Sequence, residues 1–299
     1  MKRVIVVINK WWEAEPILNA LLHSKVRPST VPWPSIFNHP RRRPLETPLP
    51  SENMNPVPRA VFLLRNCSIA FWCISDLLEH FADNAKFQSS SQRKAEHLPK
   101  IFSLQSDLVI GVGTAGFPSD ISMNGCVVIG SQVFMHNYHP HGENPDSDWQ
   151  VGRFDQILVS TLNESLFDRI TSLDASVTTR FVRPPNLAAE PLIQSRYKGV
   201  ALGDVNVTDY GEYQLADAAT LKAFSETGSS NPPISVETTH GVIRAQSETP
   251  FLFVSAITDR VGHFDSEVGR NEYSQNFAAA HNAGVVLAEM LPKIDAALA

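Results

Sequence analysis

The chain has 299 residues, of which 43% are hydrophobic and 19% are charged, and its formal net charge is −6. The apolar fraction excludes a mostly disordered chain, and the length is sufficient for one α/β domain with a large buried core. The mild acidity gives no sign of a basic surface for nucleic acid, and no apolar stretch approaches the roughly 20 residues of a membrane-spanning helix. We therefore expect a soluble cytoplasmic protein whose partners include neither nucleic acid nor a membrane.

Cysteine usage indicates a reducing compartment. Cys67, Cys73 and Cys126 are odd in number and form no Cys-x-x-Cys pair, so they fit neither a disulfide scaffold nor a structural zinc site. We expect them to be buried, reduced thiols. Several histidines lie in the polar stretch 136–152. Histidines in such a loop are commonly solvated, and we expect no metal site.

Short β-branched runs alternate along the chain with segments whose apolar residues recur at helical spacing. This alternation predicts an α/β fold with a largely parallel or mixed sheet. In chain order, the patterns predict a strand at 4–8, a helix at 13–23, a hairpin of strands at 60–64 and 68–74, a helix at 92–102, strands at 107–113, 125–130 and 132–135, a helix at 157–170, a strand at 199–203, helices at 215–224 and 236–245, a strand at 250–257 and a helix at 275–298.

The stretch 27–59 differs in composition, because it holds nine of the 21 prolines. Such a sequence supports neither a regular helix nor a central strand, so we expect a long loop. Loops of this length are packing segments, functional lids or oligomer arms, and the composition does not choose among them. The arginine run at 41–43 is too short to indicate nucleic-acid binding.

Polar residues follow several of the expected buried strands, at the sheet edge where α/β proteins bind ligands. Taken singly, each cluster is a weak signal, since a Gly-Thr-Ala-Gly turn can simply end a strand and an Asp there can cap a helix. Their order along the chain is more informative. The clusters are Glu13 with Glu15, the stretch 113–116, the stretch 203–206, Glu237 at an expected helix start, and Thr258 with Asp259.

In this order the clusters resemble those of the nucleoside phosphorylase/nucleosidase superfamily, nearest to the methylthioadenosine/S-adenosylhomocysteine and futalosine nucleosidases. The resemblance covers residues 1–24 and 105–292, and its most specific part is the strand that ends in Ile257, Thr258 and Asp259. It implies one domain over 1–299, with a three-layer αβα architecture around a central mixed, twisted sheet. It also implies a homodimer or higher homo-oligomer that needs no cofactor and binds a small-molecule nucleoside.

The reaction implied by the resemblance is hydrolysis of the N-glycosidic bond of a purine-type nucleoside through an oxocarbenium-like transition state. Asp259 matches the acid that protonates the leaving base, and burial at a strand end can raise the pKa of a carboxyl as that role requires. Glu237 matches the glutamate that grips the ribose hydroxyls. A glutamate near the N-terminus orients the attacking water. Glu15 matches it best by its distance to Leu18, and Glu13 is the second candidate.

Further substrate contacts follow from the same resemblance. Thr114 matches the turn that lies under the sugar. Asn206 stands in the segment that flanks the base, at a position where an aromatic residue is common, so hydrogen bonding replaces part of the stacking. The other residues matched to substrate-binding segments are Ala115, Gly116, Val205, Val236, His240 and Thr258.

One departure from the family concerns phosphate. The stretch 9–13 lacks the arginine of the phosphorylases' phosphate loop and carries the carboxylate of Glu13. A carboxylate there would repel phosphate, so hydrolysis is favoured over phosphorolysis. A phosphorylase with phosphate as co-substrate is the alternative, provided that arginines such as those at 41–43 or Arg260 hold the phosphate.

A second departure is Ser255, which stands where the nucleosidases tend to carry arginine. It leaves open a non-catalytic nucleoside- or nucleotide-binding protein on the same fold. On a helix over 236–245, Glu237, His240 and Arg244 would share one face. We expect His240 or Arg244 to restore the missing polar contact, with a purely structural role for this face as the alternative.

Overall fold

The computed structural model of the protein describes residues 1–23, 58–80, 90–102, 105–118, 121–136, 155–183, 192–202, 210–227, 234–269 and 272–299. Most of the proline-rich stretch and of the polar stretch 136–152 therefore lies outside the described residues. The elements are β1 (Lys2–Ile8), α1 (Trp11–Leu22), β2 (Ala60–Leu63), β3 (Cys67–Cys73), α3 (Ile74–His80), α4 (Ser90–Phe102), β4 (Leu108–Phe117), β5 (Val127–His136), β6 (Ile157–Val159), α5 (Glu164–Thr171), β7 (Ile193–Leu202), α6 (Tyr210–Glu226), β8 (Ile234–Glu237), α7 (His240–Ala245), β9 (Phe251–Arg260), α8 (Phe264–Glu267) and α9 (Glu272–Ala297), with 3-10 turns at Ile121–Met123 and Ala175–Arg180.

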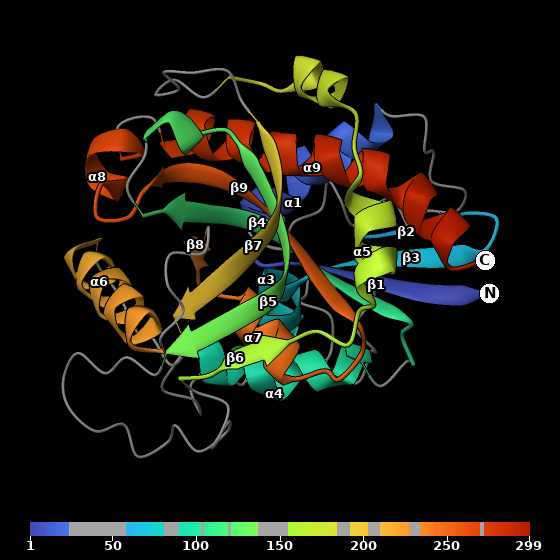
Figure 1. Cartoon of the computed structure of the whole chain (residues 1–299), viewed down its shortest axis with the longest axis horizontal. Coiled ribbons are helices and arrows are strands. Elements are labelled where there is room, and N and C mark those ends of the chain that lie inside the picture. Colours follow the sequence, from blue (N-terminus) through green and yellow to red (C-terminus); the bar gives the residue numbers. More distant parts are fainter. Residues whose placement is uncertain are drawn as a thin grey trace, which may run out of the picture.

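A nine-stranded mixed sheet forms the centre of the molecule, with helices on both sides (Figure 1). Strand β1 lies between β3 and β4 and runs parallel to both, and β2 closes an antiparallel hairpin at the edge of β3. The α/β class, the mixed sheet and the flanking helix layers expected from the sequence are confirmed.

The second half of the sheet is arranged around β9. This strand pairs in parallel with β4 and antiparallel with β5. Strand β5 continues to β6 and β7, and β7 pairs in parallel with β8. Strand β8 then returns to β4 through a single antiparallel pair, Gly116 with Val236. The strands β4, β9, β5, β7 and β8 thus pair in a closed ring, which brings the ends of β4, β8 and β9 together.

Side-chain alternation along β1 explains the two helix layers. Successive residues of a strand point to opposite faces. Val4 and Val6 pack in the core cluster that contains α1, α5 and α9. Ile5 and Val7 pack in the cluster that contains α3, α4 and α7. A strand buried on both faces needs an uninterrupted apolar run, which is why this segment has no polar alternation.

Two predicted helices are wrong in part. The segment 157–170 begins as strand β6, paired with β5, and becomes helical only at α5 after the Asn163 cap. The segment 236–245 begins as the end of strand β8, and its helix α7 starts at His240. Short apolar runs do not show whether their period is that of a strand or of a helix, so the pairing partner decides. Glu237 therefore ends a strand and does not share a helix face with His240.

Strand β4 corrects a third expectation. The stretch 113–116 was expected to leave the sheet as a turn, but β4 continues through it to Phe117. The pairing with β9 shifts by one residue between Ala115 and Gly116. Similarly, the separate strands expected at 125–130 and 132–135 form the single strand β5, whose register to β7 shifts near Gly130. These shifts bend both strands around the closed ring.

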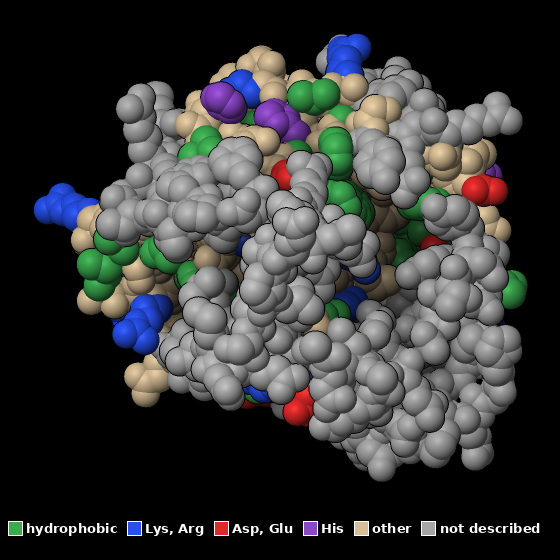
Figure 2. Space-filling view, turned by 180° about the vertical axis from the view of Figure 1, so that it is seen from behind, with side chains coloured by type: hydrophobic (Ala, Val, Ile, Leu, Met, Phe, Trp, Pro, Cys, Tyr) green, Lys and Arg blue, Asp and Glu red, His purple; other side chains and the backbone are tan. Residues whose placement is uncertain are grey.

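Cysteines lie in the core, and basic side chains are scattered over the described surface seen in Figure 2. All three cysteines are buried and none forms a disulfide. Lys and Arg side chains of the described residues are spread over the face seen in Figure 2 and do not gather in one patch. Within the described segments, no helix has the length and apolar character of a membrane span.

Candidate active site

A cavity of about 300 Å³ opens at the ends of β1, β4, β8 and β9. This volume is at the lower end of the range typical of small-molecule sites. The cavity brings together nine residues that the sequence indicated, from segments that are far apart in the chain. They are Glu13, Thr114, Ala115, Gly116, Val236, Glu237, His240, Thr258 and Asp259.

Glu13 is held at the first turn of α1 and is only 3% exposed. One carboxylate oxygen, Oε1, accepts hydrogen bonds from the amide and the hydroxyl of Thr114, each at 2.8 Å. The other, Oε2, accepts the amide of Lys10 at 2.8 Å. A Cβ atom at Gly113 would lie 2.9 Å from Glu13 Oε1, so only glycine lets the carboxylate approach β4 this closely. Burial raises the pKa of Glu13, while the three hydrogen bonds act in the opposite direction.

Glu15 was the first sequence candidate for orienting water and Glu13 the second, and of the two only Glu13 lines the cavity. Glu15 is half-buried, and it is not among the described residues that line the cavity. Residues two apart on a helix are rotated by about 200°, so Glu13 and Glu15 face nearly opposite directions. Glu15 instead interacts electrostatically with Arg59, which forms an ion pair with Asp76.

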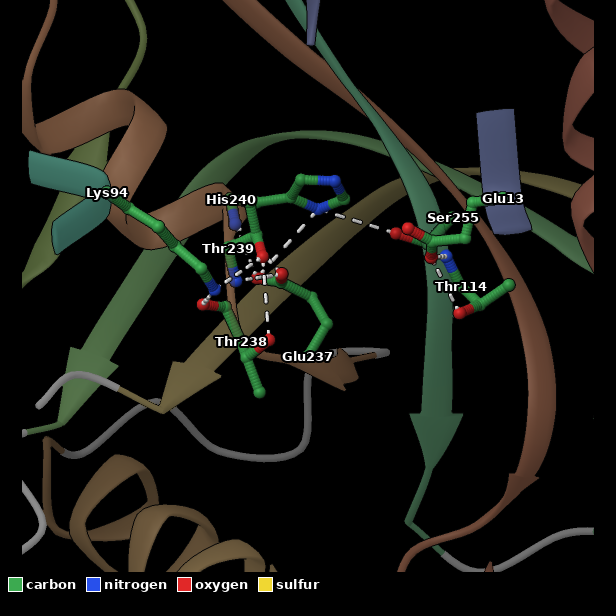
Figure 3. A network of polar contacts seen from close by, with 8 residues as sticks. All are labelled: Glu13, Lys94, Thr114, Glu237, Thr238, Thr239, His240 and Ser255. Atoms are coloured by element: carbon green, nitrogen blue, oxygen red, sulfur yellow. Dashed lines mark hydrogen bonds and ion pairs between the residues drawn. The ribbon is translucent and has the colours of Figure 1, made fainter. Parts of the chain in front are cut away.

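Glu237 is 8% exposed and ends strand β8. Its carboxylate accepts the backbone amides of Thr239 and His240, the latter at 2.8 and 2.9 Å from its two oxygens. Lys94 of α4 fixes the same loop from behind, because its Nζ donates to the carbonyl of Thr238 at 3.0 Å and to the hydroxyl of Thr239 at 3.1 Å (Figure 3). Lys94 is 2% exposed, and no motif in the sequence distinguished it.

His240 lies between the Glu237 loop and strand β9 (Figure 3). Its ring stacks on Phe253 with centroids 5.1 Å apart, and Nδ1 lies 3.4 Å from Ser255 Oγ and 3.9 Å from Glu237 Oε1. A Cβ atom at Gly111 would lie 2.5 Å from the ring, so this glycine makes the space for the imidazole. Burial lowers the pKa of His240 and nearby Lys94 adds to this, although Glu237 opposes it, so the ring is neutral at neutral pH.

Either His240 or Arg244 was expected to supply the polar contact that is missing at Ser255, and the structure places them differently. His240 contacts Ser255 and lines the cavity. Arg244 is buried elsewhere, where its guanidinium donates to the carbonyls of Ser247 and Val159. Arg244 links α7 to β6 and is not among the described residues that line the cavity.

Asp259 is 6% exposed at the end of β9. The hydroxyl of Thr258 donates to its Oδ1 at 2.5 Å, and Gln275 of α9 fixes the backbone by donating to the carbonyl of Thr258 at 2.6 Å. Burial raises the pKa of Asp259 to about 7 and the charge of Glu267 contributes, while the Thr258 hydrogen bond acts against it. A carboxyl in this environment carries its proton near neutral pH.

Arg260, which follows Asp259 in the sequence, forms an ion pair with Glu267. Arg260 Nε lies 2.5 Å from Glu267 Oε1, and the Arg260 amide also donates to Glu267. Arg260 is not among the described residues that line the cavity. The arginines at 41–43, together with Val205 and Asn206, lie outside the described residues. No group of three or more potential metal ligands occurs among the described residues, where His136 pairs with Asp155 at 2.6 Å.

Asp217 of α6 is a cavity residue that the sequence analysis missed. Burial and the charge of Asp259 raise its pKa to about 7. An acidic residue on a helix normally points to solvent, so the sequence held no signal that this one turns inward.

Neither a family model nor a curated protein sequence matches the chain. Solved structures match over nearly the whole length. A 5′-methylthioadenosine/S-adenosylhomocysteine nucleosidase from Neisseria meningitidis, solved with methylthio-immucillin-A, is 17% identical with a TM-score of 0.51, and the match covers 97% of this chain and 99% of that chain. Futalosine hydrolase of Helicobacter pylori is 13% identical with a TM-score of 0.52, covering 97% of each chain. A 5′-methylthioadenosine nucleosidase of Arabidopsis thaliana is 16% identical with a TM-score of 0.52, covering 98% of this chain and 96% of that chain.

At these identities a full-length match establishes a shared fold, and function has to be argued from the site. The matched structures agree with the resemblance that the motifs indicated. The chain therefore has the fold of the nucleoside phosphorylase/nucleosidase superfamily, shared with the methylthioadenosine/S-adenosylhomocysteine nucleosidases and futalosine hydrolase.

Proposed function

We propose that the protein hydrolyses the N-glycosidic bond of a purine nucleoside, with Asp259 as general acid, Glu237 as ribose ligand and Glu13 as the residue that orients water. The observation that carries this proposal is the gathering of these three buried carboxyls in one cavity, in different environments. Backbone amides donate to Glu13 and Glu237, whereas the Thr258 hydroxyl donates to Asp259 and burial raises the pKa of Asp259 to about 7. Carboxyls in such different surroundings are typical of acid–base catalysis.

Departure of the base is the first requirement. An anionic purine is a poor leaving group, so the base must gain a proton as the bond to C1′ breaks. Asp259, with a pKa of about 7, can donate that proton to N7, and the bonding electrons pass to the base. The sugar is left as an oxocarbenium ion at C1′.

Stabilisation of this cation is the second requirement. Glu237 and Glu13 both line the cavity, and ionised carboxylates next to a developing positive charge lower its free energy. Glu237 accepts hydrogen bonds from the ribose hydroxyls. Glu13 accepts a proton from the attacking water as its oxygen bonds to C1′, so the products are the free base and the free sugar.

The charge of the cavity supports hydrolysis over phosphorolysis. Lys10 is the only Lys or Arg among the described residues that line it, whereas Glu13, Glu237, Asp217 and Asp259 contribute carboxyls. An ionised carboxylate beside the attacking position repels phosphate and favours a neutral nucleophile.

The test is release of base from a nucleoside panel, followed by chromatography with and without phosphate. The panel holds adenosine, inosine, guanosine, methylthioadenosine, adenosylhomocysteine, futalosine and uridine. We expect a purine nucleoside to yield free sugar without phosphate, and Asp259→Asn to abolish release while the exposed Asp265→Asn control remains active. Release only with phosphate would establish a phosphorylase. Tight binding without release, unchanged in Asp259→Asn, would establish a binding protein.

A further inference from the structure

Helix α6 contributes a second acidic group to the cavity. Gln214 and Asp217 are three residues apart, so they lie on one face of the helix, and both line the cavity. Leu215, on another face, is 63% exposed. In Figure 1, α6 lies beside the carboxyl ends of β5 and β7. The helix therefore presents a carboxamide and a carboxyl to any ligand that reaches Asp259.

The Asp217 carboxyl does not stabilise the fold through polar contacts with the described part of the chain. No hydrogen bond or ion pair joins it to another described residue, in contrast to Glu13, Glu237 and Glu267, which all accept backbone amides. Asp217 is nevertheless sequestered enough for burial to raise its pKa to about 7. A half-buried carboxyl that lines the cavity and has no hydrogen bond within the described residues is available to a ligand in that cavity.

The state of Asp217 depends on Asp259, because the charge of Asp259 is part of what raises the pKa of Asp217. When Asp259 holds the proton that it donates to the base, this repulsion is absent and Asp217 ionises more readily. Burial still raises the pKa of Asp217 in that state. An ionised Asp217 beside a protonated Asp259 pairs a hydrogen-bond acceptor with a donor. The other charged or titratable groups around the cavity are Lys10, Glu13, Glu237, His240 and, behind Asp259, Glu267.

We propose that Asp217 is a specificity-determining residue of the base subsite, where its carboxylate accepts a hydrogen bond from an N–H of the bound purine. This inference rests on the proposed function, which places the base at Asp259. The substrate class is then a purine with an amino or an oxo group at position 6, because the first carries N–H at that amino group and the second carries N–H at N1. A purine without such a group would leave the carboxylate desolvated and unpaired, and sites of this kind reject it strongly.

The test uses three probes whose methyl group occupies the position of the sugar bond: 9-methyladenine, 9-methylhypoxanthine and 9-methylpurine, of which the last has no N–H. Affinities are measured by calorimetry for the wild type, Asp217→Ala and the Glu226→Ala control, which truncates an exposed carboxylate on the same helix. We expect wild type and control to bind the better N–H probe about 10- to 100-fold more tightly than 9-methylpurine, as a hydrogen bond to a charged group allows. In Asp217→Ala, the affinities for the N–H probe and for 9-methylpurine should differ by no more than about threefold.

A second variant, Asp217→Asn, keeps the shape of the side chain and adds an N–H donor. It should improve binding of 9-methylpurine, whose N1 is an acceptor. A wild-type ratio near one, or a ratio that survives in Asp217→Ala, would overturn the inference. If the wild type cleaves nucleosides and the ratio survives, the inference fails and the function stands. If the wild type discriminates between the probes and cleaves nothing, the function fails and the inference stands. If it binds no probe, the inference fails, and release of base from the nucleoside panel decides the function.

Discussion

The carboxylate of Glu13 and Thr114 are joined across 101 residues of sequence by two hydrogen bonds, which the Thr114 amide and hydroxyl donate to one carboxylate oxygen at 2.8 Å each. The pair fastens the first turn of α1 to the middle of β4. Both donors favour the ionised carboxylate, while burial raises its pKa. The carboxylate is thus held rigidly by donors that favour its ionised form, while burial favours uptake of a proton, a combination that suits the proposed role in orienting water.

This relationship predicts different outcomes for two neighbouring glutamates. Glu13→Gln should lower kcat for hydrolysis about 100-fold or more, the scale of a lost general base. Glu15→Gln, the same substitution outside the cavity, should leave kcat within about threefold. Rate measurements on both purified variants check this, with circular dichroism to show that each is folded. Equal losses in the two would contradict the assignment of Glu13.

The raised pKa of Asp259 predicts how activity depends on pH. The acid must carry its proton, so kcat/KM should fall tenfold per pH unit above about 7, the pKa of this carboxyl. Glu13 must be ionised, so activity should also fall at acid pH, below a midpoint that lies above 4.5. A profile of kcat/KM over pH 4 to 10 gives both midpoints. Activity that stays constant from pH 6 to 9 would exclude Asp259 as the acid.

The raised pKa of Asp259 also makes the stability of the fold depend on pH. The pKa of this carboxyl is 3.8 ordinarily and about 7 in the folded protein, so between these values the folded state binds more protons than the unfolded state. The free energy of unfolding therefore falls as pH rises through this window. Asp259→Asn removes this loss, and we expect the variant to exceed the wild type at pH 8 by roughly 2–4 kcal/mol, with a much smaller difference at pH 4. Urea unfolding at both pH values measures this difference in unfolding free energy. A difference that does not change with pH would show that the raised pKa of Asp259 is not its cause.

Two glycines predict a separation of activity from stability. A Cβ at Gly113 would lie 2.9 Å from Glu13 Oε1, so Gly113→Ala should displace the carboxylate and lower kcat at least tenfold. A Cβ at Gly284 would lie 2.7 Å from the backbone of Ile17, where α9 packs on α1. Gly284→Ala should therefore cost about 1–3 kcal/mol of stability and leave kcat of the folded enzyme unchanged. Thermal unfolding and rates on both variants would show whether the two effects separate.

Lys94 predicts an effect on substrate binding. Lys94→Met removes the donors to Thr238 and Thr239 and loosens the loop whose amides hold Glu237. We expect KM to rise about tenfold for ribosides and less for a 2′,3′-dideoxy analogue, which cannot use Glu237. Lys100→Met on the exposed face of the same helix is the control. A parallel change in KM for both substrates would indicate a general structural defect.

The sequence allowed prediction of the site residues whose position follows from sheet topology. Thr114 and Asp259 were proposed because they follow expected buried strands, and the carboxyl ends of such strands converge. Glu237 was proposed from the resemblance, at an expected helix start, and it instead ends strand β8. The choice between Glu13 and Glu15 was not accessible in this way, since it depends on the rotational phase of α1 against β4. The β8–α7 boundary was missed because four strand residues are too few to show a period.

Lys94 and Asp217 could not be identified from local sequence at all. Each is a charged residue on a helix, and such residues usually point to solvent. Whether such a residue turns inward depends on which element the tertiary fold places opposite it. Lys94 meets the carbonyl of Thr238, 144 residues away, and that proximity exists only in the folded chain.

Strand β9 lies between β4 and β5, although it is made long after both, and its last residues carry the proposed acid. A nascent chain that ends before β9 already contains the two proposed carboxylates, Glu13 and Glu237, but has an open ring and no proton donor. Insertion of β9 requires contacts of large sequence separation, which form late and slowly. Recovery of cleavage during refolding should consequently follow the slowest phase, so the onset of activity marks the completed fold.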